Sequence, residues 1–227
     1  QANGELKLFH LGAMDWLPNQ EGVKWFLEKC WPAVHAQHPQ LPLFLAGRGF
    51  PRELMEQEIP KVSFSGTVED AQKYMSDKQI MIVPLHSGSG LRIKILQGLA
   101  LGKTIISTSV GAEGIEVTDG KDILIADSTE AFQQKINERE QTAALSVKAS
   151  LEISADFKQA KIHFPATILQ GRIVFYRPSN AALDKSLEIN ADTSGTAFIP
   201  TDFLNKGPWN VSLTWEKDGK NYIEEQR

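Results

Sequence analysis

Ser87-Gly-Ser-Gly-Leu-Arg-Ile-Lys-Ile-Leu-Gln-Gly-Leu-Ala-Leu-Gly102 directly follows the apolar run at residues 80–85 and precedes Thr104-Ile-Ile-Ser-Thr108. This order predicts a strand, a glycine loop, a helix and a second strand. The two loop glycines let backbone amides approach a bound group closely, and the helix directs its positive end into the same loop. Such a loop favours an anion, most often a phosphate, although a glycine turn alone is weak evidence.

The first half of the chain, up to about residue 127, alternates short apolar runs with amphipathic patterns. The expected strands cover residues 6–11, 43–46, 62–65, 80–84, 104–107 and 123–125, and the expected helices include residues 22–37 and 69–75. Strands that alternate with helices predict a parallel sheet covered on both faces, an α/β Rossmann-like domain at residues 1–130. Ligands on such sheets bind beyond the carboxyl ends of the strands, where the glycine loop is expected.

The second half follows a different pattern, of short strands and turns. The expected strands cover residues 147–153, 160–164, 172–177, 196–199, 209–215 and 221–224. Trp209, Val211, Leu213 and Trp215 alternate with polar residues, and Asp218-Gly219 marks a hairpin turn. We expect a small all-β, sandwich-like domain at residues 145–227. The polar, helix-prone residues 131–144 are interpreted as a helical connector.

Composition limits the function classes. The 227 residues leave room for one large or two small domains, and the net charge of −4 has no long single-sign runs. We therefore expect no nucleic-acid partner and no polybasic membrane patch. No apolar stretch approaches the length of a membrane span, and no signal pattern opens the chain. The only cysteine, Cys30, excludes an internal disulfide and is expected in a core.

Five motifs of the first half occur in a recognisable order. They are Leu11-Gly-Ala-Met-Asp-Trp-Leu-Pro-Asn-Gln-Glu-Gly22, Leu45-Ala-Gly-Arg-Gly49, Val62-Ser-Phe-Ser-Gly-Thr-Val-Glu-Asp70, the run 88–102, and Ser107-Thr-Ser-Val-Gly-Ala-Glu-Gly114. With them, residues 6–130 resemble the C-terminal, nucleotide-sugar-binding domain of GT-B glycosyltransferases. Those are retaining enzymes built from two facing Rossmann-like domains. The resemblance implies a nucleoside diphosphate sugar as donor substrate.

The resemblance also implies roles for single residues. The donor diphosphate would be held by Gly88, Ser89, Gly90, Leu91, Arg92 and Lys94, the ribose by Gln97, and the donor side would be formed by loops containing Gly12, Asn19, Gly47 and Gly66. With Arg92 and Lys94 to neutralise the diphosphate, no metal and no further cofactor is expected. Lys94 is the stronger candidate, because it shares a helix face with Gln97, three positions on, whereas Arg92 does not share a face with Lys94.

Departures from the family pattern predict a weakened site. Many relatives carry acidic residues at the positions of Ser89 and Gln97, and a neutral amide lacks a charge-assisted acceptor, so we expect low donor affinity. Ala13 and Glu21 replace a basic pair of the first loop. The N-terminal acceptor-binding domain is missing from the sequence, and no catalytic residue is assigned. We therefore expect donor binding without sugar transfer, in the cytoplasm.

Residues 132–227 resemble the extracytoplasmic part of FixH family proteins. The resemblance rests on the polar helix 133–143, on Gly171-Arg-Ile-Val-Phe-Tyr-Arg-Pro-Ser-Asn180, and on Gly207-Pro-Trp-Asn-Val-Ser-Leu-Thr-Trp-Glu-Lys-Asp-Gly-Lys220. It implies a membrane-anchored setting, a membrane-complex partner and a role in cytochrome oxidase assembly. The alternative function is thus a non-enzymatic assembly protein with the α/β half as passenger. Because the two resemblances imply opposite sides of a membrane, we hypothesise a chimera with its seam near residues 128–133.

Three other interpretations are weaker. His35 and His38, three apart, lack a third metal ligand and are expected at the surface. Asp15 and Glu21 fit a donor-side loop better than a glycosidase acid and base. The aromatic stripe of residues 209–215 is expected to pack a core rather than to stack on sugars.

Overall fold

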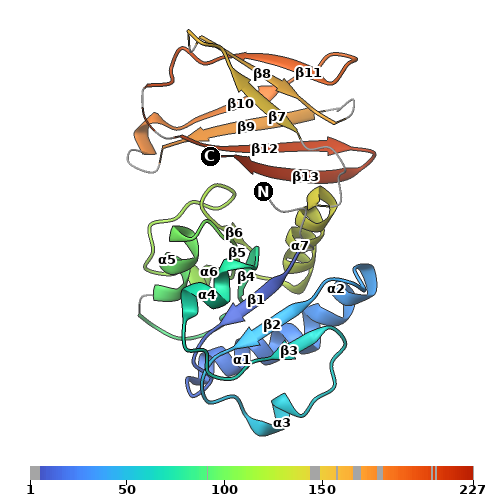
Figure 1. Cartoon of the computed structure of the whole chain (residues 1–227), viewed down its shortest axis with the longest axis vertical. Coiled ribbons are helices and arrows are strands. Elements are labelled where there is room, and N and C mark those ends of the chain that lie inside the picture. The colour runs from blue at the N-terminus through green and yellow to red at the C-terminus, as the bar shows by residue number, and fades with distance from the viewer. Residues whose placement is uncertain are drawn as a thin grey trace. The chain divides into compact units, whose positions relative to one another are not determined.

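The computed structural model of the chain divides into two compact units, residues 1–137 and 138–227 (Figure 1). It describes residues 6–226 except 91, 144–148, 157, 166–169, 178–180, 206 and 208. Within this described part, no helix is both long enough and apolar enough to cross a bilayer. Each unit is considered by itself below.

The first unit is built on one parallel sheet of six strands in the order β3-β2-β1-β4-β5-β6. The strands are β1 (Leu8–Leu11), β2 (Leu43–Ala46), β3 (Val62–Phe64), β4 (Ile80–Val83), β5 (Thr104–Ser107) and β6 (Leu124–Ile125). Strand β1 pairs with both β2 and β4, with Leu8 opposite Leu43 and Ile80. All six predicted strands are confirmed, and the strand order reverses beside β1, where α/β sheets form a ligand crevice.

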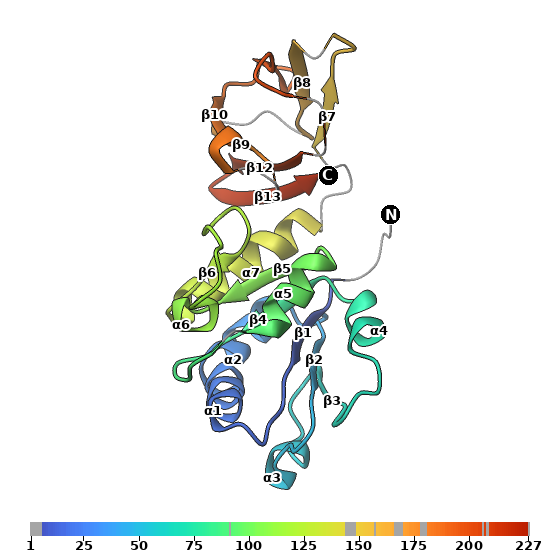
Figure 2. The same ribbon diagram turned by 90° about the vertical axis from the view of Figure 1, so that its left-hand side faces the viewer.

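Helices cover both faces of this sheet (Figure 2). The helical elements are α1 (Leu17–Trp25), the π-helical η1 (Phe26–Cys30), α2 (Trp31–Gln37), α3 (Arg52–Met55), α4 (Ala71–Ser76), α5 (Ile93–Ala100), α6 (Ser109–Ala112) and α7 (Thr129–Ala143). Of these, α3 has no buried residue and lies beyond the ends of the strands. The helical segment predicted at residues 22–37 begins earlier, at Leu17. Its π turn precedes Pro32, whose ring cannot fit the regular hydrogen-bond ladder of an α-helix. The four-residue helices α3 and α6 were not predicted.

Two apolar cores lie on opposite faces of the sheet. One joins alternate strand residues such as Leu8 and Ile82 to α1, η1 and α2, and it contains the fully buried Cys30. The other joins the intervening strand residues to α4, α5 and α6. Phe132 and Ile136 of α7 are completely buried in the first core. The first half of the predicted connector is therefore a packed helix of the α/β unit.

The second unit consists of two antiparallel sheets, β10-β9-β12-β13 and β11-β8-β7, around one core. The strands are β7 (Ser150–Ile153), β8 (Gln159–His163), β9 (Gln170–Tyr176), β10 (Lys185–Ile189), β11 (Thr196–Pro200), β12 (Asn210–Lys217) and β13 (Lys220–Gln226), with a 3-10 turn η2 (Ala181–Leu183). The all-β prediction is confirmed. Strand β10 was missed because its Lys-Ser-Leu-Glu-Ile pattern is half polar.

The predicted turn at Asp218-Gly219 joins β12 to β13. Both residues have positive φ, 52° and 70°, and the hairpin closes with Lys217 opposite Lys220. Two positive φ values define the turn type that matches the twist of paired strands. Leu213 and Trp215 face the core, as the alternation predicted.

Candidate functional site

A cleft of about 370 Å³ opens beyond the carboxyl ends of β1 and β4. It is lined by Leu11, Gly12, Ala13, Trp16, Asn19, Ser89, Arg92, Ile93 and Lys94. The first five come from the end of β1, the loop after it and the start of α1, and the others from the loop after β4 and the start of α5. The cleft therefore lies at the reversal point of the strand order, where parallel sheets hold their ligands.

The glycine loop reaches the cleft because it packs tightly on the loop after β1. Gly88 has a φ of +111°, and a Cβ there would lie 2.7 Å from the ring of Trp16. Only glycine fits that contact. Gly90, with a φ of +92° and open space around it, needs glycine for its backbone conformation alone.

Arg92 is a buried cation at the N-cap of α5, with 4% of its surface exposed. Its Nη1 donates to the carbonyl oxygens of Ser89, at 2.8 Å, and Gly90, at 2.5 Å. Its guanidinium carbon lies 5.1 Å from the centre of the Trp16 ring. Nε and Nη2 are buried without a hydrogen-bond partner. Free donors on a buried guanidinium favour an anionic ligand.

Lys94 lies two residues further along, and its Nζ donates to Oδ1 of Asn19 at 2.7 Å. The Asn19 side chain is itself fixed, because its Nδ2 donates to the carbonyl oxygen of Ala13 at 2.8 Å. Burial, and then the charge of Arg92, lower the pKa of Lys94 to about 7. Two cations thus share one side of the cleft.

His10 was not recognised in the sequence as a neighbour of this site. Its ring is fully buried, Nδ1 lies 2.9 Å from the carbonyl oxygen of Ile82, and Nε2 has no hydrogen-bond partner. Burial, and then Lys94, keep the pKa of His10 well below its usual value, so its ring is neutral at neutral pH. The available signal was a lone polar residue in the otherwise apolar strand Leu8–Leu11.

The predicted donor-side glycines lie at the ends of three neighbouring strands. A Cβ at Gly12 would lie 2.8 Å from Nζ of Lys94 and 2.9 Å from both Nδ2 of Asn19 and Nε2 of His10. Gly47, with a φ of +150°, donates its N–H to the carbonyl oxygen of Gly66 at 2.6 Å. The loops after β1, β2 and β3 therefore meet through backbone contacts.

Not every predicted site residue lies in the cleft. Gln97 is exposed on α5 and is not among the lining residues, because it lies almost a full helical turn beyond Lys94. Leu91 lies outside the described residues. Glu21 accepts a hydrogen bond of 3.3 Å from the Ser87 hydroxyl, and Asp15 pairs with Arg48 at 2.9 Å, so the structure offers no close acid pair there.

His35 of α2 and His38, which follows this helix, both contact other side chains. His35 stacks on Trp31 and Nε2 of His38 lies 2.8 Å from Oδ1 of Asn137. Among the residues that the structure describes, no group of three or more His, Cys, Asp and Glu side chains could hold a metal ion.

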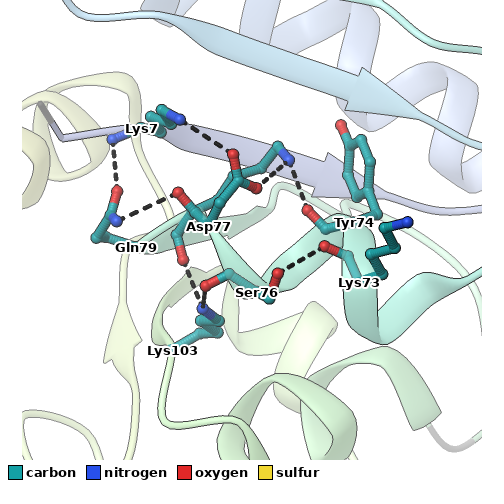
Figure 3. A network of polar contacts seen from close by, with 8 residues as sticks. Lys7, Lys73, Tyr74, Ser76, Asp77, Gln79 and Lys103 are labelled. Atoms are coloured by element: carbon teal, nitrogen blue, oxygen red, sulfur yellow. Dashed lines mark hydrogen bonds and ion pairs between the residues drawn. The ribbon is translucent and has the colours of Figure 1, made fainter. Parts of the chain in front are cut away.

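A second polar cluster lies at the amino ends of the parallel strands, opposite the end of the sheet that carries the cleft. Figure 3 shows its contacts. Asp77 pairs with Lys7 at 3.0 Å and with Lys78 at 2.8 Å, and Lys103 donates to the carbonyl oxygens of Ser76 and Lys78. These residues directly precede the amino ends of β1, β4 and β5. The lysines donate hydrogen bonds to carbonyl oxygens at the C-terminal end of α4, so the cluster stabilises the fold at the end of the sheet away from the cleft.

The six-stranded parallel sheet with helices on both faces defines a Rossmann-like α/β domain. A family model described as glycosyl transferases group 1 matches residues 5–139, and the chain belongs to this family. A second model, FixH, matches residues 128–227. The two matches overlap within the region of α7, so the chain is a fusion of two family segments.

Comparison with individual proteins covers mainly the first unit. The chain is 28% identical over 129 residues to the "uncharacterized 44.6 kDa protein in cps region" of Klebsiella pneumoniae, and the match covers 52% of this chain and 33% of that protein. The chain thus spans about a third of that relative's length. The C-terminal domain of the glycosyl transferase group 1 family protein LpcC from Francisella tularensis aligns over 59% of this chain and 74% of its own, with 16% identity and a TM-score of 0.46. TarM aligns over 58% of this chain and 27% of its own, with 13% identity and a TM-score of 0.47.

Proposed function

We propose that the first unit binds a nucleoside diphosphate sugar in the 370 Å³ cleft, as the donor half of a retaining glycosyltransferase. The observation that carries this proposal is the convergence of Ser89, Arg92 and Lys94 with the first loop, at the reversal point of the sheet. Membership of the glycosyl transferase family makes a nucleotide sugar the ligand of choice.

The charges of the cleft suit the chemistry of donor cleavage. Sugar transfer releases a nucleoside diphosphate, and the principal electrostatic task is to stabilise the negative charge that develops on it. The unpaired donors of Arg92 and the ammonium of Lys94 would contact the diphosphate, assisted by the amide end of α5. With two cations in place, neither a metal nor another cofactor is required.

Sugar transfer also requires an acceptor-binding domain that completes the cleft. The proposed acceptor-binding domain is supplied by another segment or chain, and we assign no catalytic residue here. We therefore propose that this chain binds the donor without transferring its sugar. Robust transfer by the purified chain would reject that part of the proposal.

A second candidate function belongs to the second unit. The FixH match over residues 128–227 and the antiparallel β architecture favour a non-enzymatic assembly role with a partner in a membrane complex. In that case the α/β unit would be a passenger. The two family matches imply a cytoplasmic setting for the first unit and an extracytoplasmic one for the second, and we propose from this mismatch that the fusion is an engineered or mis-joined product. The same continuous reading frame in native DNA would reject this.

Calorimetric titration of the full chain with uridine, guanosine and adenosine diphosphates and their sugars tests the donor proposal. We expect binding that prefers one base and weakens by roughly 1 to 3 kcal/mol in Lys94→Ala, as for a hydrogen bond to a charged group. Lys103→Ala is the matched control, because Lys103 lies at the amino ends of the strands, away from the cleft. This variant should bind the ligand like the parent. Absence of binding across the panel would favour the assembly role.

A further inference from the structure

The ammonium of Lys94 has a neutral partner. Oδ1 of Asn19 accepts from Nζ at 2.7 Å while Nδ2 donates to the Ala13 carbonyl oxygen at 2.8 Å. Exchanging the two amide atoms would place the NH₂ group against the ammonium and the amide oxygen against the Ala13 carbonyl oxygen, and would lose both bonds, so this orientation is fixed. Asn19 is 3% exposed and cannot move aside into solvent.

The titratable neighbours of Lys94 are either positively charged or neutral. Arg92 contributes a second cation from the start of α5, and His10 contributes a neutral ring from β1. Among the described residues that line the cleft there is no carboxylate. The carboxylates on the adjoining elements are otherwise engaged, Asp15 with Arg48 and Glu21 with Ser87.

A buried cation beside another cation favours loss of its proton, and an anion at the same place favours its return. Because Arg92 also has two buried donors without a partner, the cleft has an excess of positive charge and of donors. Both are balanced by one ligand, a group with at least one full negative charge.

We propose that Asn19 is a positioning residue that holds Lys94 at the cleft without a counter-charge, so that the bound anion itself supplies the charge partner and its binding takes up a proton. This inference rests on the proposed function in taking an anion as the ligand. It adds that the affinity is set by the protonation of Lys94 and that a carboxylate at position 19 would compete with the ligand.

The test follows the ¹³Cε resonances of the lysines by NMR in the full chain, with inorganic sulfate as the probe. Sulfate stays fully ionised near neutral pH, so any proton taken up comes to the protein. We expect Lys94, assigned by its loss in Lys94→Arg, to titrate near pH 7 without sulfate. With sulfate, its midpoint should rise by about one pH unit or more. Sulfate affinity should fall by up to about tenfold for each pH unit above neutrality.

Asn19→Asp changes charge at nearly constant size. The new carboxylate should raise the Lys94 midpoint by roughly one to three pH units. It should also weaken sulfate binding by about tenfold and remove most of its dependence on pH near neutrality, because Lys94 is then charged but already paired. Asn137→Asp is the control, because the Asn137 amide donates to Gln37 and does not line the cleft. It should change neither the Lys94 midpoint nor the sulfate affinity. Lys94→Arg provides an independent test if Asn19→Asp does not fold, since its sulfate affinity should not vary with pH.

Three results would overturn the inference: a Lys94 midpoint at the ordinary value for lysine, a midpoint unchanged by Asn19→Asp, or no sulfate binding. The proposed function fails differently. Sulfate binding with the expected pH dependence, but no nucleotide binding, would leave the role of Asn19 intact and reject the nucleotide-sugar donor.

Discussion

The carbonyl oxygen of Gly12 lies so close to Gly47 that a Cβ at position 47 would approach it to 1.7 Å. The same two loops are joined by backbone hydrogen bonds, from the Gly12 N–H to the Ala46 oxygen at 3.0 Å and from the Met14 N–H to the Arg48 oxygen at 2.7 Å. The loops after β1 and β2 thus form one rigid layer beneath the cleft.

Gly47→Ala should therefore destabilise the first unit by about 2–4 kcal/mol, because overpacking against backbone adds to an unfavourable φ of +150°. Amide hydrogen exchange of β1 and β2 would report the loss. Gly120→Ala is the control, since Gly120 has a positive φ of +75° but open space, and about 1 kcal/mol is expected there. Equal losses at the two positions would contradict the close approach.

Gly12→Ala should reduce ligand binding more than stability. Its methyl group would lie 2.8 Å from Nζ of Lys94 and 2.9 Å from both Nδ2 of Asn19 and Nε2 of His10. Asn19 and His10 are buried, so Nζ of Lys94, at the end of a flexible side chain, is the atom that can give way. We expect Lys94 to leave its place on Asn19 and anion affinity to fall by roughly tenfold, as when one charge-assisted contact is lost. Titration with the preferred ligand, compared with amide exchange in β1, separates the two effects. A variant with parental affinity would show that Lys94 is not needed at this position.

Much of the fold could be predicted because its elements carry strong local signals. The strands of the α/β unit are short continuous apolar runs, and the hairpin at Asp218-Gly219 is fixed by turn chemistry alone. The predicted connector lacked such a signal, since only Phe132 and Ile136 of α7 are apolar enough to reveal a packed face. Strand β10 was not predicted because it also lacks a strong local signal, and its pairing with β9 is decided by tertiary contacts.

The candidate site was predictable only where chain order implied spatial proximity. The glycine loop placed Ser89, Arg92 and Lys94, and the topology of parallel strands then brought Asn19 to them. His10 was missed because an isolated histidine in a strand has no motif. Gln97 was placed with Lys94 by helical spacing, which gives the side of a helix but not the distance from its end.

Stability of the first unit should decrease in acid through Asp77. Its hydrogen bond with Lys78, and then that with Lys7, lower the pKa of Asp77 to about 2. Because the folded-state pKa lies below the unfolded value, the contribution is present above about pH 4 and is lost as the pH falls toward 2. Its side chain is 57% exposed, so we expect no more than about 1 kcal/mol.

Asp77→Asn should lower the stability of the first unit by this amount already at neutral pH, and the stability should then fall less steeply in acid. Amide exchange of β4 at several pH values measures both effects. Glu56→Gln removes an exposed pair with Arg52 on α3 and serves as the control, with about 0.3–0.5 kcal/mol expected. Identical acid limbs in the parent and Asp77→Asn would reject the role of Asp77.

Cys30 should resist thiol reagents in the folded chain. It is the last residue of η1 and is fully buried in the core, and burial raises its pKa to about 12, so the reactive thiolate is scarce even in mild alkali. Cys30 should react with a disulfide reagent only when the chain unfolds. The reaction should therefore be slow in buffer and fast in concentrated urea. Fast labelling of the native chain would show that this core opens readily.

The hairpin of the second unit should depend on the handedness of its turn. Asp218 has a φ of 52°, which Asn tolerates well and a β-branched residue does not. Asp218→Asn should leave the stability within about 0.5 kcal/mol, whereas Asp218→Val should lower it by about 1–2 kcal/mol. The stacked rings of Trp215 and Tyr222, 5.5 Å apart across β12 and β13, give a near-ultraviolet circular dichroism signal to follow during unfolding. Because both substitutions remove the same charge, any difference between them reports backbone conformation, and equal effects would contradict the left-handed turn.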